Sequence, residues 1–493
     1  MALITLLATL APWLIGTAVV YALVYGLGRA DTLQLSDHCM VIGSGAYVGY
    51  VVLAAGMIAL LTLGLNPFSA VAVAAWSLLT AASVAVIVQR FRLNPLSIRP
   101  RGTLIERAIT AVGVGWLMTL AAWLGVEVWH NPVMSWDVVL NFGIDAQKQI
   151  TAALGDEPRL TAGGTHPATV VMILVWSAFW ADIGPTHVLG TGPWWVMYAG
   201  VVLMTAGLIR QWAQHWGLAV WLTAAIVSAP LIESHTAQGG YADLWVLGGL
   251  VAGLCWVLGG HNRTQRLSTM LVGLAVLVSV IGIKNTSVVY ALIVMMGVGL
   301  GVLLTGRRAV LGYAAIVAIA AAMGMVLIWG IEIDIGPLRA GFSPEDGELR
   351  LGNRSGGLAQ VTPSEVVWNL WHAWVLASSF GVMFAAALIA LPVATVYALI
   401  TKDRVGTILA VSAWGLIGFL FAAQFSEYFL PAARVVSDTG LSRTSHAVYW
   451  ITTMAVLATA ISAAHRARNR HTTPPAAGAS RERSATTPTR PEA

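Results

Sequence analysis

The sequence contains little charge for its length. Of 493 residues, 10% are Asp, Glu, Lys or Arg and 57% are hydrophobic. Soluble domains carry about 25% charged residues, so a chain of this composition cannot solvate a globular surface of its own size. The scarcity of charge excludes a soluble globular protein and indicates that lipid is the solvent around most of the chain.

Cysteine and nucleotide-binding motifs are also scarce. The two cysteines, Cys39 and Cys255, lie in or near apolar segments, which argues against a disulfide framework. No Walker motif is present, and the glycines of residues 43–49 lack dinucleotide-binding spacing and suit helix packing instead. The formal charge of +5 comes from basic residues spread over short loops and the tail, so no nucleic-acid partner is predicted. No cofactor is predicted either, and the metal dependence stays open.

What the sequence does contain is a series of long apolar runs. The runs are continuous rather than alternating, which predicts helices and not the strands of a closed barrel. The fold class predicted is all-α, a polytopic transmembrane protein of about thirteen spans. The predicted spans are 2–27, 41–64, 68–90, 108–128, 193–209, 217–232, 242–260, 267–283, 287–305, 309–331, 367–398, 405–424 and 445–464.

Residues 166–181 are apolar but too few to span, and Asp182 follows them, so they are predicted to form a juxtamembrane or re-entrant helix. With thirteen spans, one side of the membrane then receives 19 Lys and Arg residues and the other side 8. Counting 166–181 as a span would break this asymmetry. An excess of Lys and Arg marks the cytoplasmic side, which predicts a cytoplasmic C-terminus and long loops outside.

Three regions are predicted along the chain. No Lys or Arg precedes Arg29, so the first apolar run is read as a retained span and not as a signal peptide. The long outer loops make the outer face the expected place of function. The predicted regions are an N-terminal three-span module with a basic cytoplasmic loop (1–107), a catalytic membrane module (108–465) with outer loops 129–165, 332–366 and 425–444, and a disordered cytoplasmic tail (466–493).

Charged residues avoid the middle of every predicted span. Glu127, Asp243, Lys284 and Glu332 all lie at predicted outer ends. Ionisable residues in spans are usually functional, and ion-coupled transporters place them near the midplane. This distribution favours a site at the outer membrane surface over a transport path.

The first outer loop predicts an interfacial helix starting near Asp137. Phe142, Ala146 and Ile150 form part of an apolar stripe, and Asp137 and Asp145 lie on the opposite, polar face. The two carboxylates would be about 12 Å apart along the helix, too far to share a proton. Asp137 either acts alone in the site or caps this helix.

The second outer segment, PLIESHTAQGGYADLW, predicts a sharp turn between two spans. Gly239 and Gly240 permit close backbone approach, and Glu233, His235 and Asp243 crowd polar groups into a small space. Alternatively, Asp243 caps the following helix and Glu233 is solvated. His235 has no spaced partner motif, so a metal site is not predicted there.

Three of the cations on the predicted outer side are candidates for a binding site. Lys284 sits between two uncharged spans, and Arg434 and Arg443 precede the last one. Lys284 either reaches toward lipid headgroups or holds a phosphate. Because Arg434 and Arg443 occur where the charge rule disfavours them, an anionic ligand is predicted there.

Five short features follow one another along the chain on the predicted outer side: Trp136-Asp137, His166-Pro167, Gly240-Tyr241-Ala242-Asp243, Lys284-Asn285 and Ser442-Arg443. In their order and common side, they resemble the GT-C superfamily of membrane glycosyltransferases, which use polyprenyl-phosphate-linked sugars. The resemblance covers roughly residues 108–465. Members commonly have one span before the first large loop, whereas this chain has three additional ones.

The resemblance implies an enzyme that transfers sugar to a glycan, lipid or protein acceptor on the outer face of the plasma membrane. It implies that Asp137 is the catalytic base and that Asp243 is the second acidic residue of the site. Lys284 and Arg443 would bind phosphate, and Glu233, His235, Asp145 and Arg434 complete the expected substrate-binding set. The alternatives are a transporter or lipid flippase, and a polymerase or ligase of lipid-linked glycans.

Overall fold

The computed structural model describes most of the chain. Nothing below concerns residues outside the described ranges. These ranges are 2–26, 33–93, 103–130, 142–161, 167–181, 192–259, 266–284, 287–306, 310–312, 314–316, 318, 331–335, 338–343, 348–351, 354–356, 361–376, 380–425 and 445–472.

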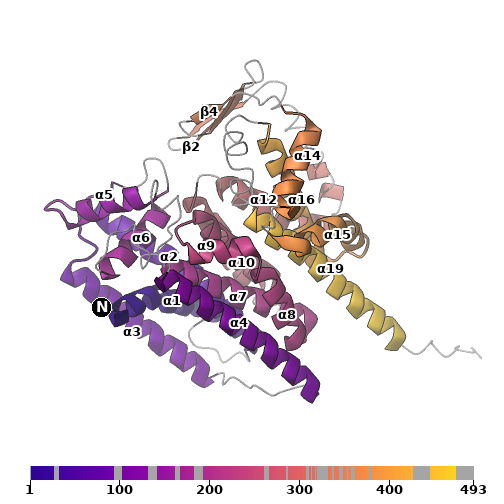
Figure 1. Ribbon diagram of the computed structural model, residues 1–493, viewed down its shortest axis with the longest axis horizontal. Helices are drawn as coiled ribbons and strands as arrows, with labels where there is room; N and C mark the ends of the chain where they lie inside the picture. The colour runs from indigo at the N-terminus through magenta and orange to yellow at the C-terminus, as the bar shows by residue number, and fades with distance from the viewer. Residues whose placement is uncertain are drawn as a thin grey trace, which may run out of the picture.

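The described chain is dominated by helices (Figure 1). The first half contains α1 (Ala2–Tyr25), α2 (Leu35–Thr62), α3 (Ala70–Leu93), α4 (Leu104–His130), α5 (Gly143–Leu154), α6 (Ala168–Ala181), α7 (Gly192–Ala213), α8 (Trp216–Val227), α9 (Pro230–Ala237) and α10 (Ala242–Leu258). The second half contains α11 (Arg266–Ser279), η3 (Val280–Gly282), α12 (Ser287–Thr305), α14 (Pro363–Trp371), η4 (His372–Leu376), α15 (Gly381–Ile400), α16 (Arg404–Ala423) and α19 (His446–Thr472).

Within these ranges, nine helices are long and apolar enough to cross a membrane, and the bent pair α8–α9 makes a tenth if it counts as one span. This agrees with the prediction of a helical, multi-pass membrane protein. The total of thirteen spans stays a prediction, because the predicted span 309–331 lies largely outside the described residues. The α6 helix has 14 residues, about 21 Å at 1.5 Å per residue, so it is too short to span the bilayer alone.

Two predicted spans are divided in the structure. Residues 217–232 form α8 and the start of α9, which are bent by 70° at Ser228–Ala229, where Pro230 opens the new helix. Residues 367–398 contain the end of α14, all of η4 and most of α15. Because the 20 residues of α15 already reach about 30 Å, the apolar residues before it are not needed to cross the bilayer.

The core forms where α1, α2, α6, α7 and α10 pack together. Glycines allow α1 and α2 to approach closely: a methyl group added at Gly49 would overlap the carbonyl group of Pro12, and one added at Gly16 would overlap that of Gly45. The two N-terminal helices therefore share one core with α7 and α10, which belong to the region of the GT-C resemblance. In contrast, α3 lies at the edge of the bundle (Figure 1).

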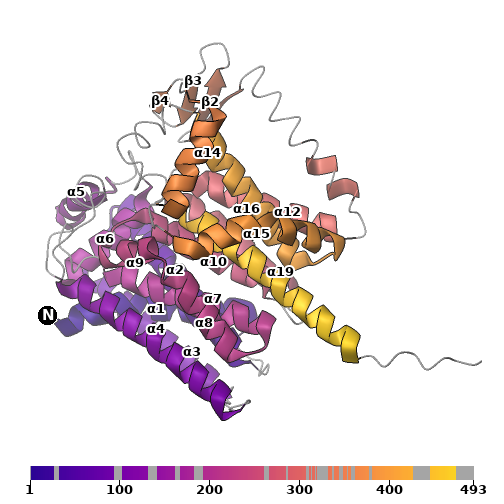
Figure 2. The same ribbon diagram turned by 45° about the vertical axis from the view of Figure 1, so that its right-hand side comes forward.

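Part of the predicted outer loop 332–366 folds as a small antiparallel sheet, which the sequence analysis did not predict. Its strands follow one another in the order β1 (Ile331–Ile335), β2 (Leu338–Ser343), β3 (Glu348–Leu351) and β4 (Arg354–Gly356). Asp334 is opposite Arg339 in the first pair. The sheet lies above α14, and α3, α4 and α19 extend toward the other side of the bundle (Figure 2). We refer to the side with the sheet as the predicted outer side.

Candidate functional site

The site begins at the first turn of α10, on the predicted outer side. Gly239 and Gly240 have positive φ angles of 61° and 78°, a conformation that glycine adopts without strain, and they turn the chain from α9 into α10. Asp243 then lies in the first turn of α10, where a carboxylate interacts favourably with the helix dipole. It is buried, and its side chain is 5% exposed.

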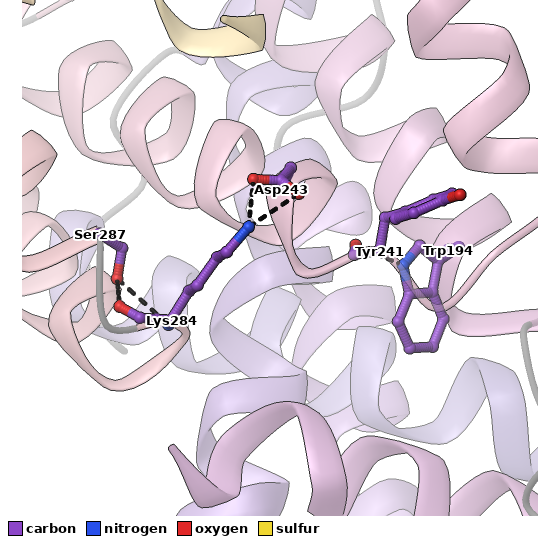
Figure 3. Close-up of polar contacts among 5 residues, drawn as sticks. All are labelled: Trp194, Tyr241, Asp243, Lys284 and Ser287. Atoms are coloured by element: carbon purple, nitrogen blue, oxygen red, sulfur yellow. Dashed lines mark hydrogen bonds and ion pairs between the residues drawn. The ribbon is translucent and has the colours of Figure 1, made fainter. Parts of the chain in front are cut away.

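Lys284 comes from a different part of the chain, two residues after the end of η3. Its backbone N–H donates to Ser287 Oγ over 3.2 Å (Figure 3). The same Ser287 Oγ lies 2.6 Å from the carbonyl oxygen of Val280. Ser287 begins α12 and is fully buried. The hydroxyl of Ser287 therefore holds the short connection between η3 and α12, and with it the base of the lysine side chain.

Asp243 and Lys284 form an ion pair. The Lys284 ammonium donates to Asp243 Oδ1 over 3.0 Å and to Oδ2 over 3.1 Å (Figure 3). The lysine side chain is 25% exposed, against 5% for the aspartate. Two of the three ammonium protons point to the carboxylate, so one is left for another acceptor. Because each charge compensates the other, both can be held at the end of uncharged helices at a tolerable desolvation cost.

Tyr241 connects this pair to α7. The indole N–H of Trp194, near the start of α7, donates to the Tyr241 carbonyl oxygen over 2.8 Å (Figure 3). Trp194 is fully buried and packs edge-on against Trp245, with ring centroids 5.8 Å apart. This hydrogen bond ties the segment before Asp243 to a rigid helix.

A second contact of Tyr241 brings in two histidines. The His235 ring of α9 stacks on Tyr241 with centroids 4.1 Å apart and lies 4.4 Å from the ring of His446, the first residue of α19. Both histidines are buried. Trp374 Nε1 donates to Ser445 Oγ over 2.6 Å, which joins η4 to the same place. His235 contributes to the packing of α9, α10 and α19, and its predicted contact with substrate stays a prediction.

Glu233 lies on α9, just beyond the predicted span 217–232. It is half-buried, and burial raises the pKa of its carboxyl above the usual value. Tyr198 lies in the neighbouring helix α7, is fully buried, and its hydroxyl has no hydrogen-bond partner among the described residues. Sequence reasoning singled out Glu233 but missed Tyr198, because a tyrosine within an apolar helix carries no signal of its own.

Asp145 lies in the first turn of α5, partly exposed and apart from the α10 segment in sequence. The predicted stripe is confirmed around it, since Phe142 and Ala146 are buried and α5 packs on α6. The described part of α5 begins later than the predicted helix, at Gly143. The remaining predicted site residues, Asp137, Arg434 and Arg443, lie outside the described residues, so their proximity to the ion pair stays a prediction.

Among the described residues, no group of three or more His, Cys, Asp and Glu side chains is arranged to hold a metal ion. What the structure does bring together is the Lys284 ammonium and the Asp243 carboxylate bound to it, at the first turn of α10 and shortly before α12. The partly exposed ammonium can bind an anionic oxygen. The chain matches no family model, no curated protein and no solved structure.

Proposed function

We propose that the protein is a membrane glycosyltransferase that transfers a sugar from a polyprenyl-phosphate-linked donor to an acceptor hydroxyl on the outer face of the plasma membrane. The observation that supports this most is the Lys284 ammonium, which Asp243 holds in place at the end of helices that are otherwise uncharged. The C-terminus is cytoplasmic in this proposal, and the donor approaches laterally from the bilayer.

The ion pair suits the phosphate of a lipid-linked donor. Its partly exposed lysine retains a proton that can be donated to a phosphate oxygen, and Asp243 keeps the ammonium oriented. Charge develops on the departing phosphate in the transition state, where a fixed cation in a dry environment is most effective. Arg443 would supply a second cation, as the resemblance to the GT-C superfamily implies.

Direct displacement accounts for the chemistry. A bond forms between the acceptor oxygen and the anomeric carbon while the bond from that carbon to the phosphate oxygen breaks. The polyprenyl phosphate leaves with the electron pair, and the acceptor proton passes to a carboxylate, which is Asp137 in this proposal. One displacement inverts the configuration at the anomeric carbon.

The test uses the purified full-length chain in lipid nanodiscs with polyprenyl-phosphate-linked mannose, arabinose and glucose. We expect one donor to be consumed and Lys284→Met to reduce its turnover at least about 100-fold, the range seen when one electrostatic stabiliser is removed. Lys148→Met, on the exposed face of α5, is the matched control and should retain full turnover. Full turnover by Lys284→Met would show that the ion pair takes no part in the reaction. Consumption of none of the three donors would contradict the proposed donor class.

A further inference from the structure

The turn between α15 and α16 and the last turns of α19 carry positive charge that the proposed transfer does not use. Both are predicted to be cytoplasmic, and α19 extends away from the sheet (Figure 2). Residues 399–404 and 465–472 hold five cations and one acid, which leaves a net charge of +4 with histidine neutral. We refer to the five cations as the basic cluster, which consists of Lys402, Arg404, Arg466, Arg468 and Arg470.

Close packing brings the end of α19 against the α15–α16 turn. A β-carbon added at Gly406, in the first turn of α16, would lie 2.6 Å from Thr459 Oγ1 of α19 and 3.1 Å from the β-carbon of Ala398 in α15. Two turns further along α19, Arg466 Nη2 donates to the Thr401 carbonyl oxygen over 2.9 Å. Arg466 is exposed, and this bond uses one of the five N–H donors of its guanidinium group. Segments 60 residues apart in the sequence therefore present their cations together.

Lys402 has an unusual backbone conformation for its residue type. It follows the C-cap Thr401 with a φ angle of 53°, the left-handed conformation that helix ends usually assign to glycine. It is exposed. The acid beside it, Asp403, caps α16, since its Oδ1 accepts from the Gly406 N–H over 3.3 Å. A glycine would close α15 with less strain, so the lysine contributes charge to this turn and not stability.

An exposed apolar stripe on α15 ends at the basic cluster. Its residues recur at helical spacing on one face and are each at least 57% exposed: Ile389, Val393, Val396 and Ile400. From first to last the stripe covers about 16 Å at 1.5 Å per residue, close to the hydrocarbon thickness of one leaflet, about 15 Å. Lys402 comes two residues after the stripe. A lipid whose acyl chain covers this stripe therefore has its headgroup at the basic cluster.

We propose that the basic cluster binds the headgroup of an anionic phospholipid whose acyl chains lie along the α15 stripe. Arginine and lysine side chains donate charge-assisted hydrogen bonds to phosphate oxygens, and several cations directly beyond a membrane helix favour anionic lipids. The stripe selects an amphiphile, because a free phosphate or an acidic peptide would contact the cations alone. The site lies away from the Asp243–Lys284 pair and does not depend on the proposed sugar transfer.

Lipid binding to the full-length protein in detergent tests the site. The protein is titrated with dioctanoyl phosphatidylglycerol or dioctanoyl phosphatidylcholine at constant ionic strength, and native mass spectrometry gives the apparent Kd of the first bound lipid. We expect phosphatidylglycerol to bind at least about tenfold more tightly than phosphatidylcholine. Lys402→Gly and Arg466→Gln should each weaken phosphatidylglycerol binding about fivefold, the fold-change that corresponds to about 1 kcal/mol per basic residue at an anionic membrane surface.

Two control variants separate the loss of this site from a general loss of charge or of fold. Arg92→Gln removes an exposed cation at the end of α3, on the same predicted side of the membrane, and should keep the wild-type Kd. Gln214→Gly changes another exposed residue with a positive φ angle, 60°, without changing the charge. Lys402→Gly and Gln214→Gly should both keep or raise the thermal unfolding midpoint, whereas Lys402→Gly alone should weaken phosphatidylglycerol binding.

Several outcomes would overturn the inference. Equal affinity for the two lipids would show that the headgroup charge is not recognised. An unchanged Kd in both Lys402→Gly and Arg466→Gln, or an equal weakening by Arg92→Gln, would show that the basic cluster is not the binding site. Displacement of phosphatidylglycerol by glycerol 3-phosphate at equal concentration would assign the cluster to a soluble phosphate, and displacement by polyglutamate would assign it to an acidic protein segment.

Discussion

The helices α3 and α10 are alike in sequence and opposite in surroundings. Both are apolar and uncharged along their middle, yet 15 of the 17 residues of α10 are buried within the protein, against two of the 24 residues of α3, Ser83 and Arg90. Most of the α3 surface is exposed in the described structure, as expected of a helix that faces lipid, whereas other helices surround α10. Of these two helices, α10 begins with a buried carboxylate and α3 does not, because protein groups surround the start of α10 and Lys284 compensates the charge of Asp243.

The two helices should differ most in the loss of stability caused by a larger side chain. At Gly253 in α10, a β-carbon would lie 3.0 Å from the carbonyl oxygen of Gly273, in the tight crossing with α11. We expect Gly253→Leu to destabilise the protein by about 3 kcal/mol, the upper range of overpacking. Ala82→Leu on exposed α3 should cost less than about 0.5 kcal/mol. Thermal unfolding in nanodiscs measures both, and equal effects would contradict the contrast between the helices.

The next effect concerns the charge at the start of α10. Lys284→Met leaves the Asp243 carboxylate buried without its cation, and we expect a loss of about 2–3 kcal/mol, somewhat below the range for fully buried pairs because Lys284 is partly exposed. Adding Asp243→Asn to the same chain should restore most of that stability. A double-mutant cycle on unfolding free energies gives the result, and additive losses would show that the two residues do not stabilise each other.

A smaller effect is expected from the indole that ties α7 to α10. Trp194→Phe keeps a large ring but removes the hydrogen bond to Tyr241, so we expect a loss of about 1 kcal/mol. The matched control is Trp414→Phe in α16, whose exposed indole donates to Thr395 over 3.0 Å. The thermal unfolding midpoint of Trp414→Phe should barely change. A larger shift of the unfolding midpoint for Trp414→Phe than for Trp194→Phe would contradict the stabilising role of the Trp194 hydrogen bond.

The smallest effect is a dependence on pH. Because the folded pKa of Glu233 is raised, the folded state binds this proton more tightly than the unfolded state does. The contribution of Glu233 to stability is therefore fully present below the usual glutamate pKa and is lost as pH rises through the raised folded pKa. The free energy of unfolding measured across that pH window should decrease as pH rises, and the decrease should be smaller in Glu233→Gln. An unchanged slope in this variant would contradict the effect.

Much of the site could be anticipated residue by residue but not as an arrangement. Asp243, Lys284 and Glu233 stood out because charge is rare and lies at predicted outer ends, and the structure pairs the first two. Tyr198 and Trp194 could not be singled out, because aromatic residues are common near the ends of membrane helices. The stacking of His235 on Tyr241 depends on the bend before Pro230, which apolar periodicity does not reveal.

The sequence by itself determined the helical, multi-pass character of this protein, since apolar runs of this length must satisfy their backbone hydrogen bonds internally in lipid. It also determined that charges gather at helix ends, where their desolvation is least costly. Only the tertiary structure decided which helices are surrounded by protein and which by lipid, and that Lys284 lies against Asp243. Hydrophobic composition is the same in both surroundings, so packing between distant segments alone distinguishes them.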